Sequence, residues 1–141
     1  MSPRTQTAVL QELLAAEHAM VFGYGVAGAR LRGADRLRAQ AGWVSHGDER
    51  DRLVGLVTAR GATPRPPAPS YALASPVRST GDAVALLAVL EERLADVWAD
   101  AVARLTGDLR SLAAAGLAEA AVAGARWRGT STAFPGLPER G

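Results

Sequence analysis

The sequence predicts an all-α protein, a four-helix bundle with a long proline-rich crossover between its second and third helices. Apolar residues recur at steps of three and four through four long segments, which is the period of a helix. No segment alternates between apolar and polar residues over the length of a strand. The chain has 141 residues and shows no internal repeat, so we expect residues 1–141 to form a single domain with one core.

The first two helices are expected over residues 5–31 and 34–60. Gly33 follows the first segment and Gly61 follows the second, and glycine commonly ends a helix. The apolar row of the first helix consists of Leu10, Leu13, Leu14, Val21, Tyr24, Gly28 and Leu31. The residues of the second helix that we expect to face the core are Trp43, Leu53 and Val57.

The third and fourth helices are expected over residues 81–106 and 108–127. Ser79 or Thr80 can cap the first of them, and Gly107 separates the two. The apolar row of the third helix consists of Val84, Leu87, Leu94, Trp98, Ala101 and Leu105. The alanine-rich row of the fourth, which favours close approach to a neighbour, consists of Leu109, Leu112, Gly116, Ala120 and Ala123.

The connections predict the topology. Short links make the first and second helices antiparallel, and likewise the third and fourth. The segment between residues 61 and 80 is long and rich in proline, so we expect an extended strap. At about 3.1 Å per residue it can run the length of the bundle, which lets the third helix start parallel to the second. The side chains expected to anchor it are Tyr71, Leu73 and Val77.

The last segment, residues 128–141, is rich in glycine and proline and is not expected to be helical. Three apolar residues in it, Phe134, Pro135 and Leu137, are expected to dock on the bundle. A peptide-like interaction motif is the alternative interpretation of this tail.

Composition excludes several functional classes. The chain has no cysteine and two histidines, so a metal site would rest mainly on carboxylates. The net charge is only +2, and the densest arginine cluster, Arg30 to Arg38, lacks interleaved aromatic residues, which argues against nucleic-acid binding. No apolar run is long enough to cross a membrane, and residues 1–10 hold no secretion signal, so a cytoplasmic protein is expected.

Polar residues inside the apolar rows are the candidate functional residues. Glu17 falls on the inward row of the first helix and Glu91 on that of the third. His46 and Arg50 fall between apolar residues of the second helix, at a similar depth. A buried carboxylate is costly unless it is paired or bound to a metal, so we expect these four groups to meet. His18 lies one residue off the row and is expected at a helix–helix seam.

Two chemical interpretations follow, and a third is structural. Glu17 and Glu91 could bridge metal ions, with His46 and Glu49 as further ligands. Alternatively, Arg50 and His46 neutralise the two carboxylates in a metal-free network. The permanent charge of Arg50 favours the network, because it would repel a divalent cation. In the third interpretation, these rows simply tolerate polar residues at a wet end of the bundle.

Several stretches together resemble a known family. They are AAEHAMVFGYGVAGARL (15–31), HGDERDRL (46–53), RGATPRPPAPSYAL (60–73), the pair Glu91-Glu92, RWRG (126–129) and AFPGLP (133–138). With these stretches the chain resembles a ferritin-like domain, and more closely an uncharacterised actinobacterial family of ferritin-like proteins. The resemblance covers nearly the whole chain and implies no established activity.

The resemblance implies a metal-site pattern that this chain keeps only in part. Ferritin-like metal proteins carry single glutamates on helices one and three, which Glu17 and Glu91 match, and Glu-x-x-His on helices two and four. Helix two instead offers His46-x-x-Glu49, and Glu119 on helix four is followed three residues later by a valine. At most a partial site for iron or manganese remains, with Glu17, His46, Glu49 and Glu91 as ligands.

We therefore expect a non-catalytic bundle that acts through binding a small ligand or through self-association as a homodimer. A metal-binding or oxidoreductase-type protein is the alternative. The motif Gly23-x-Gly25-x-x-Gly28 matches a dinucleotide fingerprint, but the residues before it follow a helical period and not a strand. These glycines instead predict close contact with a bulky neighbouring side chain, such as a tryptophan.

Overall fold

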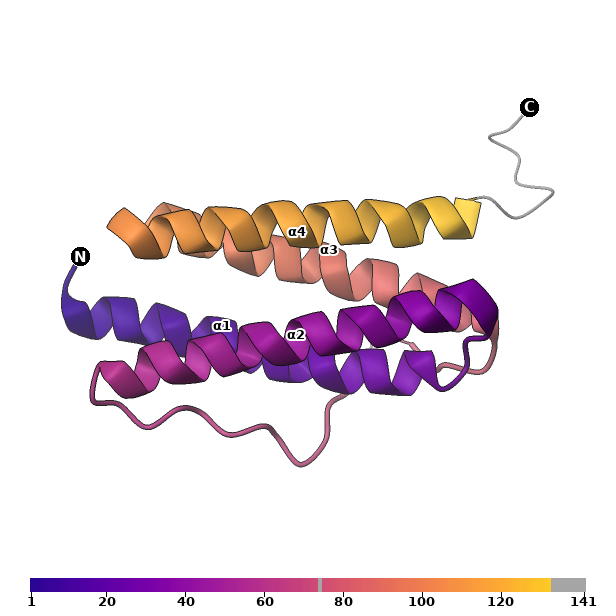
Figure 1. The fold of residues 1–141 in the computed structure, drawn as a ribbon, viewed down its shortest axis with the longest axis horizontal. Helices are drawn as coiled ribbons and strands as arrows, with labels where there is room; N and C mark the ends of the chain where they lie inside the picture. Colours follow the sequence, from indigo (N-terminus) through magenta and orange to yellow (C-terminus); the bar gives the residue numbers. More distant parts are fainter. Residues whose placement is uncertain (74, 133–141) are drawn as a thin grey trace.

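The computed structural model describes residues 1–73 and 75–132 of the chain, and this part folds into four long helices and no strand (Figure 1). The prediction of an all-α helical bundle is confirmed. The helices are α1 (Pro3–Gly28), α2 (Gly33–Ala59), α3 (Thr80–Arg104) and α4 (Gly107–Thr132). Helix α4 runs past the predicted end near Trp127. The expected docking of Phe134, Pro135 and Leu137 lies outside the described residues.

Local signals account for the helix ends. Ser79 caps α3, as predicted, because its Oγ accepts a hydrogen bond of 3.0 Å from the backbone N–H of Asp82. Ser2 caps α1 in the same way by accepting from the N–H of Thr5 at 3.1 Å. Gly33 has a φ of +58°, a conformation that favours glycine, and it allows the chain to turn sharply from α1 into α2.

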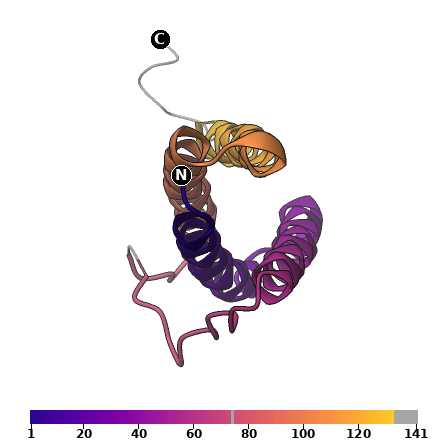
Figure 2. The same cartoon turned by 90° about the vertical axis from the view of Figure 1, so that its left-hand side faces the viewer.

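The helices are arranged as an open C when they are viewed end-on (Figure 2). The order around the C is α4, α3, α1 and α2, so α1 and α3 form the seam between two antiparallel hairpins. No Cα atom of α2 comes within 8 Å of a Cα atom of α4 in the described part of the chain. Helices α1 and α4 run in one direction and α2 and α3 in the other (Figure 1).

The segment between α2 and α3 lies along α1 and is held there by polar contacts. The Gln11 side chain donates to the carbonyl of Thr63 at 2.8 Å and accepts from the N–H of Arg65 at 2.8 Å. His18 Nε2 lies 2.9 Å from the carbonyl oxygen of Arg65. The buried His18 therefore fixes this connecting segment to α1 and is no part of the central polar cluster.

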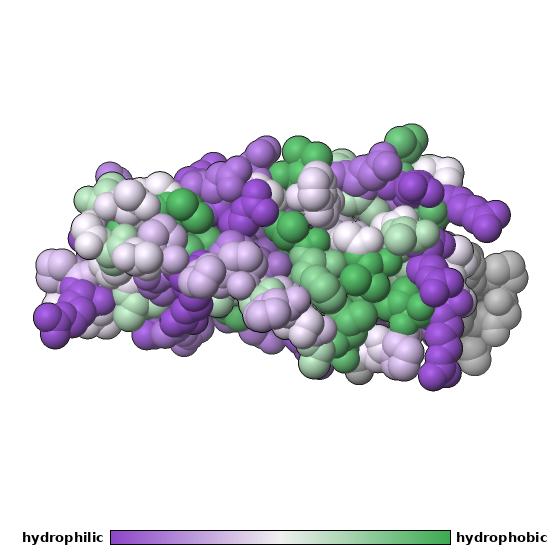
Figure 3. Space-filling model, turned by 90° about the horizontal axis from the view of Figure 1, so that it is seen from below, coloured by the Kyte–Doolittle hydropathy of each residue, from purple (hydrophilic) through white to green (hydrophobic). Residues whose placement is uncertain are grey.

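Apolar side chains fix the same segment further along. The rings of Phe22 and Tyr71 lie 5.3 Å apart, and Leu73 and Val77 pack against the core. These are the anchors that the sequence predicts. The face of the molecule on this side carries hydrophobic surface between its polar side chains (Figure 3).

The core lies between α1 and α3 and extends to both outer helices. Of the three core residues predicted on α2, Leu53 and Val57 are fully buried, but Trp43 is 49% exposed. The prediction for Trp43 is wrong because, among the described helices, α2 packs closely against α1 alone, so a narrower stripe of α2 is covered. No helix of the described part is both long and apolar enough to span a bilayer.

Glycines allow close packing at three points. A Cβ on Gly23 would overlap with Leu90, and one on Gly116 would overlap with the ring of Trp98. A Cβ on Gly42 would meet the ring of Tyr24. The predicted bulky neighbour of the Gly23 motif is thus a leucine, and Gly25 of the same motif faces open space.

Candidate functional site

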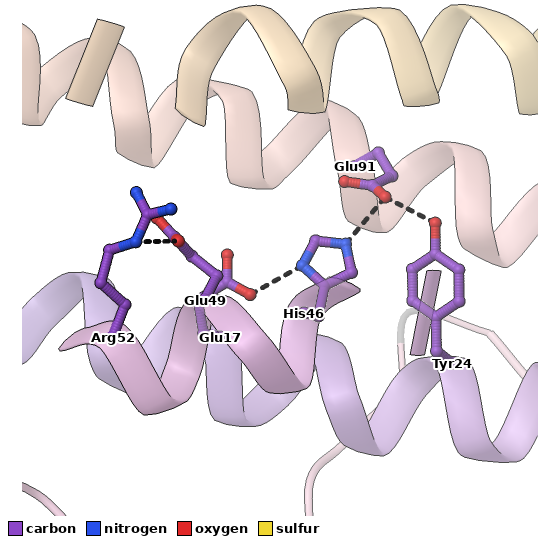
Figure 4. A network of polar contacts seen from close by, with 6 residues as sticks. All are labelled: Glu17, Tyr24, His46, Glu49, Arg52 and Glu91. Carbon is purple, nitrogen blue, oxygen red and sulfur yellow. Dashed lines mark hydrogen bonds and ion pairs between the residues drawn. The ribbon is translucent and has the colours of Figure 1, made fainter. Parts of the chain in front are cut away.

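Two buried glutamates and a half-buried histidine, from three helices, meet at the centre of the molecule. Glu17 of α1 is 1% exposed and Glu91 of α3 is 2% exposed. His46 of α2 lies between them, with Nδ1 2.7 Å from Glu17 Oε2 and Nε2 2.9 Å from Glu91 Oε2 (Figure 4). We call these three residues the Glu–His–Glu network. Their positions on the inward rows bring them together at this depth.

The imidazole of His46 carries the positive charge of the network. Burial lowers the pKa of His46, but hydrogen bonds to Glu17 and Glu91 and the charges of both carboxylates outweigh it and raise the pKa to about 10. His46 is therefore protonated at neutral pH and donates from both nitrogens. Burial raises the pKa of Glu17, against the hydrogen bond and charge of His46.

The network extends to α4 through two aromatic residues. The Tyr24 hydroxyl donates to Glu91 Oε2 at 2.5 Å, and Trp127 Nε1 donates to the Tyr24 oxygen at 2.9 Å. Burial and the charge of Glu91 raise the pKa of Tyr24, which keeps the hydroxyl protonated. Sequence reasoning placed Tyr24 in the core without a polar partner and missed Trp127, although both lie on the inward faces of their helices.

One carboxylate oxygen of the network has no partner in the described part of the chain. Glu91 Oε1 is buried and accepts no hydrogen bond there, whereas Oε2 accepts two. In Figure 4, no dashed line reaches the other oxygen of Glu91, which lies on the side away from Tyr24. A buried acceptor without a donor is costly, so this atom marks a place where a donor is needed.

A cleft lies beside the network, between α2 and α4, with a volume of about 310 Å³. It is lined by one glutamate from each helix, namely Glu17, Glu49, Glu91 and Glu119. Its apolar wall includes Leu94, Trp98 and small alanines of α4. Sequence reasoning set Glu119 aside because no histidine follows it three residues later. Its place among the other acids results from the packing of α4 on α3, which the spacing along one helix does not specify.

The other end of the cleft is basic. Arg38 and Arg126 line it, and the Arg38 guanidinium lies 4.2 Å from the ring centre of Trp127. Arg38 Nη1 also donates to Thr130 Oγ1 at 2.9 Å, so this side chain bridges α2 and α4. The cleft therefore has an acidic centre and a basic end.

Residues 9–139 match the model of a family described as Domain of unknown function (DUF4439). The chain belongs to this family. The chain is also similar to the crystal structure of a conserved hypothetical protein, rv2844, from Mycobacterium tuberculosis, with 30% sequence identity. That match has a TM-score of 0.87 and covers 92% of this chain and 99% of the other. No curated protein is significantly similar to the chain.

Two predicted site residues of this DUF4439 chain lie outside the central network. Arg50 does not reach the carboxylates; its Nε pairs with Asp51 Oδ1 at 3.0 Å and its side chain is 33% exposed. The long Arg50 side chain keeps its guanidinium hydrated by turning toward solvent, and His46 provides the neutralising charge instead. Glu49 lines the cleft and pairs with Arg52 at 3.4 Å.

The metal interpretation of the DUF4439 site meets a geometric difficulty. Both nitrogens of His46 already lie within hydrogen-bond distance of carboxylates, so neither is free as a ligand. Across the described residues, no three acidic or histidine side chains are arranged to hold one metal ion. The side chains as they stand therefore do not fit a metal ion.

Proposed function

We propose that this chain is a ferritin-like bundle that binds a small ligand, without catalysis, in the cleft between α2 and α4. The Glu–His–Glu network would stand where ferritin-like metal proteins hold their metal ions. The resemblance in the sequence supports this assignment, since Glu17 and Glu91 match the single glutamates of that pattern. The reversed His46-x-x-Glu49 order explains why a histidine reaches both carboxylates.

The double engagement of His46 carries the proposal. An imidazolium with both N–H groups bound to buried carboxylates supplies the positive charge that a metal would otherwise supply. In this proposal the Glu–His–Glu network stabilises the fold, and the neighbouring cleft binds the small ligand. Its volume of about 310 Å³ and its mixed apolar and polar lining are typical of a small-molecule site.

Screening small molecules of every charge class by NMR tests the binding function. The indole N–H groups of Trp98 and Trp127 report from the cleft, and Trp43 lies outside it as an internal reference. We expect compounds that shift the Trp98 signal and leave Trp43 unchanged. Ala123→Leu narrows the cleft and should abolish those shifts. A screen in which no compound of any charge shifts Trp98 would refute binding in the cleft.

The alternative function is metal binding at a partial site of Glu17, His46, Glu49 and Glu91, with iron or manganese. The observation in its favour is that carboxylates from all four helices line one cleft. Metal analysis of protein purified without chelator decides between the two. We expect far less than one equivalent of metal. One equivalent of iron or manganese that disappears in Glu17→Ala would establish the alternative instead.

A further inference from the structure

The unpartnered Glu91 Oε1 indicates what kind of group the cleft accepts. The Glu91 side chain is 2% exposed, lines the cleft, and has one oxygen saturated by His46 and Tyr24. The other oxygen has no donor within the described part of the chain. A ligand that enters the cleft with an N–H donor would satisfy this acceptor at the point where the protein leaves it unsatisfied.

Charge selects among possible donors. Glu17, Glu49 and Glu119 lie around the same part of the cleft as Glu91, and the imidazolium of His46 is shared by two of the four. Burial raises the pKa of Glu49, and the nearby charges of Glu17 and Glu119 raise it further, against the pull of Arg52. The centre of the cleft therefore has an excess of negative charge that a cation would relieve.

The basic end gives the ligand a direction. Arg38 stacks on Trp127, and Arg126 comes from the adjacent position of α4. Both guanidinium groups repel a cation and push it toward the glutamates. On the side of the glutamates away from these arginines, Leu94 and Trp98 provide an apolar surface for the uncharged part of the ligand, because Trp98 packs at Gly116 whereas Glu91 packs at Gly124, closer to Arg126.

We propose that the cleft binds a small organic cation, with a primary ammonium group that donates to Glu91 Oε1 between Glu49 and Glu119 and an apolar body against Leu94 and Trp98. This inference rests on the proposed binding function and specifies its ligand class. A bare metal ion finds no group of three ligands arranged for it in the described part of the chain.

Three probes of one shape and different charge test the proposal. Benzylammonium, benzyl alcohol and benzoate are titrated separately into the ¹⁵N-labelled full-length chain, and the indole signals of Trp98 and Trp43 are followed. We expect benzylammonium to shift Trp98 in a saturable manner and to bind at least about tenfold more tightly than benzyl alcohol, with benzoate weakest. The signal of Trp43, outside the cleft, should stay unchanged.

Neutralising substitutions locate the cation. Glu49→Gln and Glu119→Gln should each weaken benzylammonium binding by about threefold to tenfold. Asp96→Asn is the matched control, because it removes the same charge from an exposed position of α3 outside the cleft. Glu91→Gln would alter the acceptor itself, but Glu91 is buried and this variant can fail to fold. The side chains of Glu49 and Glu119 are less buried, so their variants test the proposal independently of Glu91→Gln.

The outcomes separate this inference from the binding function on which it rests. If benzyl alcohol or benzoate shifts Trp98 as strongly as benzylammonium, the cleft binds ligands but the cation assignment is wrong. If Glu49→Gln, Glu119→Gln and Asp96→Asn have equal effects, the ammonium lies elsewhere and the inference fails. If none of the probes shifts Trp98, the inference also fails, and the screen of all charge classes decides the binding function alone. Competitive displacement by Mn²⁺ would assign the acidic centre to metals.

Discussion

At the scale of single residues, His46 pairs with two buried carboxylates, and within the described part of the chain no other cation forms an ion pair with them. Its bonds of 2.7 and 2.9 Å to Glu17 and Glu91 join α1, α2 and α3 at one point. A charge-assisted bond of this kind is stronger than a neutral one, and the loss of one partner leaves the other buried and unpaired. The stability of the centre therefore depends on this one side chain.

We expect His46→Gln to lower the free energy of unfolding by about 3 kcal/mol, because two buried carboxylates lose their counter-charge. Urea denaturation of the variant and the parent measures the difference. His18→Gln is the matched control, since the hydrogen bond of His18 among the described residues is to the Arg65 backbone carbonyl at 2.9 Å, and its loss should cost about 1 kcal/mol. Equal losses in the two variants would contradict a special role of His46.

The raised pKa of His46 also predicts a pH dependence. The folded protein holds this proton more tightly than the unfolded chain, whose histidine has its usual pKa of 6.5. The resulting stabilisation is fully present below pH 6.5 and is lost as the pH rises toward about 10. The free energy of unfolding should therefore fall between pH 7 and pH 10, and His46→Gln should flatten this decline. If the parent protein is equally stable at pH 7 and pH 10, His46 is not protonated in the folded state as proposed.

At the scale of elements, the contact between α3 and α4 depends on the absence of a side chain at Gly116. The Trp98 ring lies where a Cβ of Gly116 would stand, with ring carbons at 2.5–2.8 Å from it. A rigid indole cannot move aside without disturbing its buried neighbours. The alanine-rich row that the sequence shows on α4 is explained by this close approach.

Gly116→Ala should therefore destabilise the protein by about 1–3 kcal/mol through overpacking, although alanine favours helices. The matched substitution is Gly25→Ala on α1, where nothing lies within 4 Å of the added Cβ and a gain of up to about 1 kcal/mol is expected. Thermal unfolding of both variants compares the signs. If both substitutions change the stability in the same direction, packing against Trp98 does not determine the effect of Gly116→Ala.

Helix period predicts which face of each helix is buried but not what packs against it. The rows of α1 and α3 were predicted well because both helices lie in the seam and are covered on two sides. Trp43 was misplaced because, among the described helices, α2 is covered by one helix only.

Arg50 shares a face with His46, yet a long side chain can leave that face for Asp51 and solvent. Trp127 and Glu119 depend on the neighbours of α4, which spacing along one helix does not specify.

At the scale of the whole molecule, α2 exposes three large apolar side chains beside its polar ones. Leu37 is 67% exposed, Trp43 49% and Val44 53%, all on the helix that is covered on one side only. Large apolar side chains gathered on one helix favour association. We propose that a homodimer forms through this surface of α2.

Light scattering of the parent chain should give the mass of a dimer, and Leu37→Glu with Val44→Glu should give a monomer with an unchanged helical circular dichroism spectrum. Val122→Glu is the control, because Val122 is also 50% exposed but lies on α4. A parent chain that stays monomeric at high concentration would rule out the homodimer.

Three hydrogen bonds of the centre connect the α1–α2 hairpin with the α3–α4 hairpin. Glu17, His46 and Tyr24 come from the α1–α2 hairpin, whereas Glu91 and Trp127 come from the α3–α4 hairpin. Either hairpin alone would expose its apolar face and leave an ionisable group without its partner. Neither half is thus an independent folding unit, and the chain is expected to unfold cooperatively, in a single transition that both halves share.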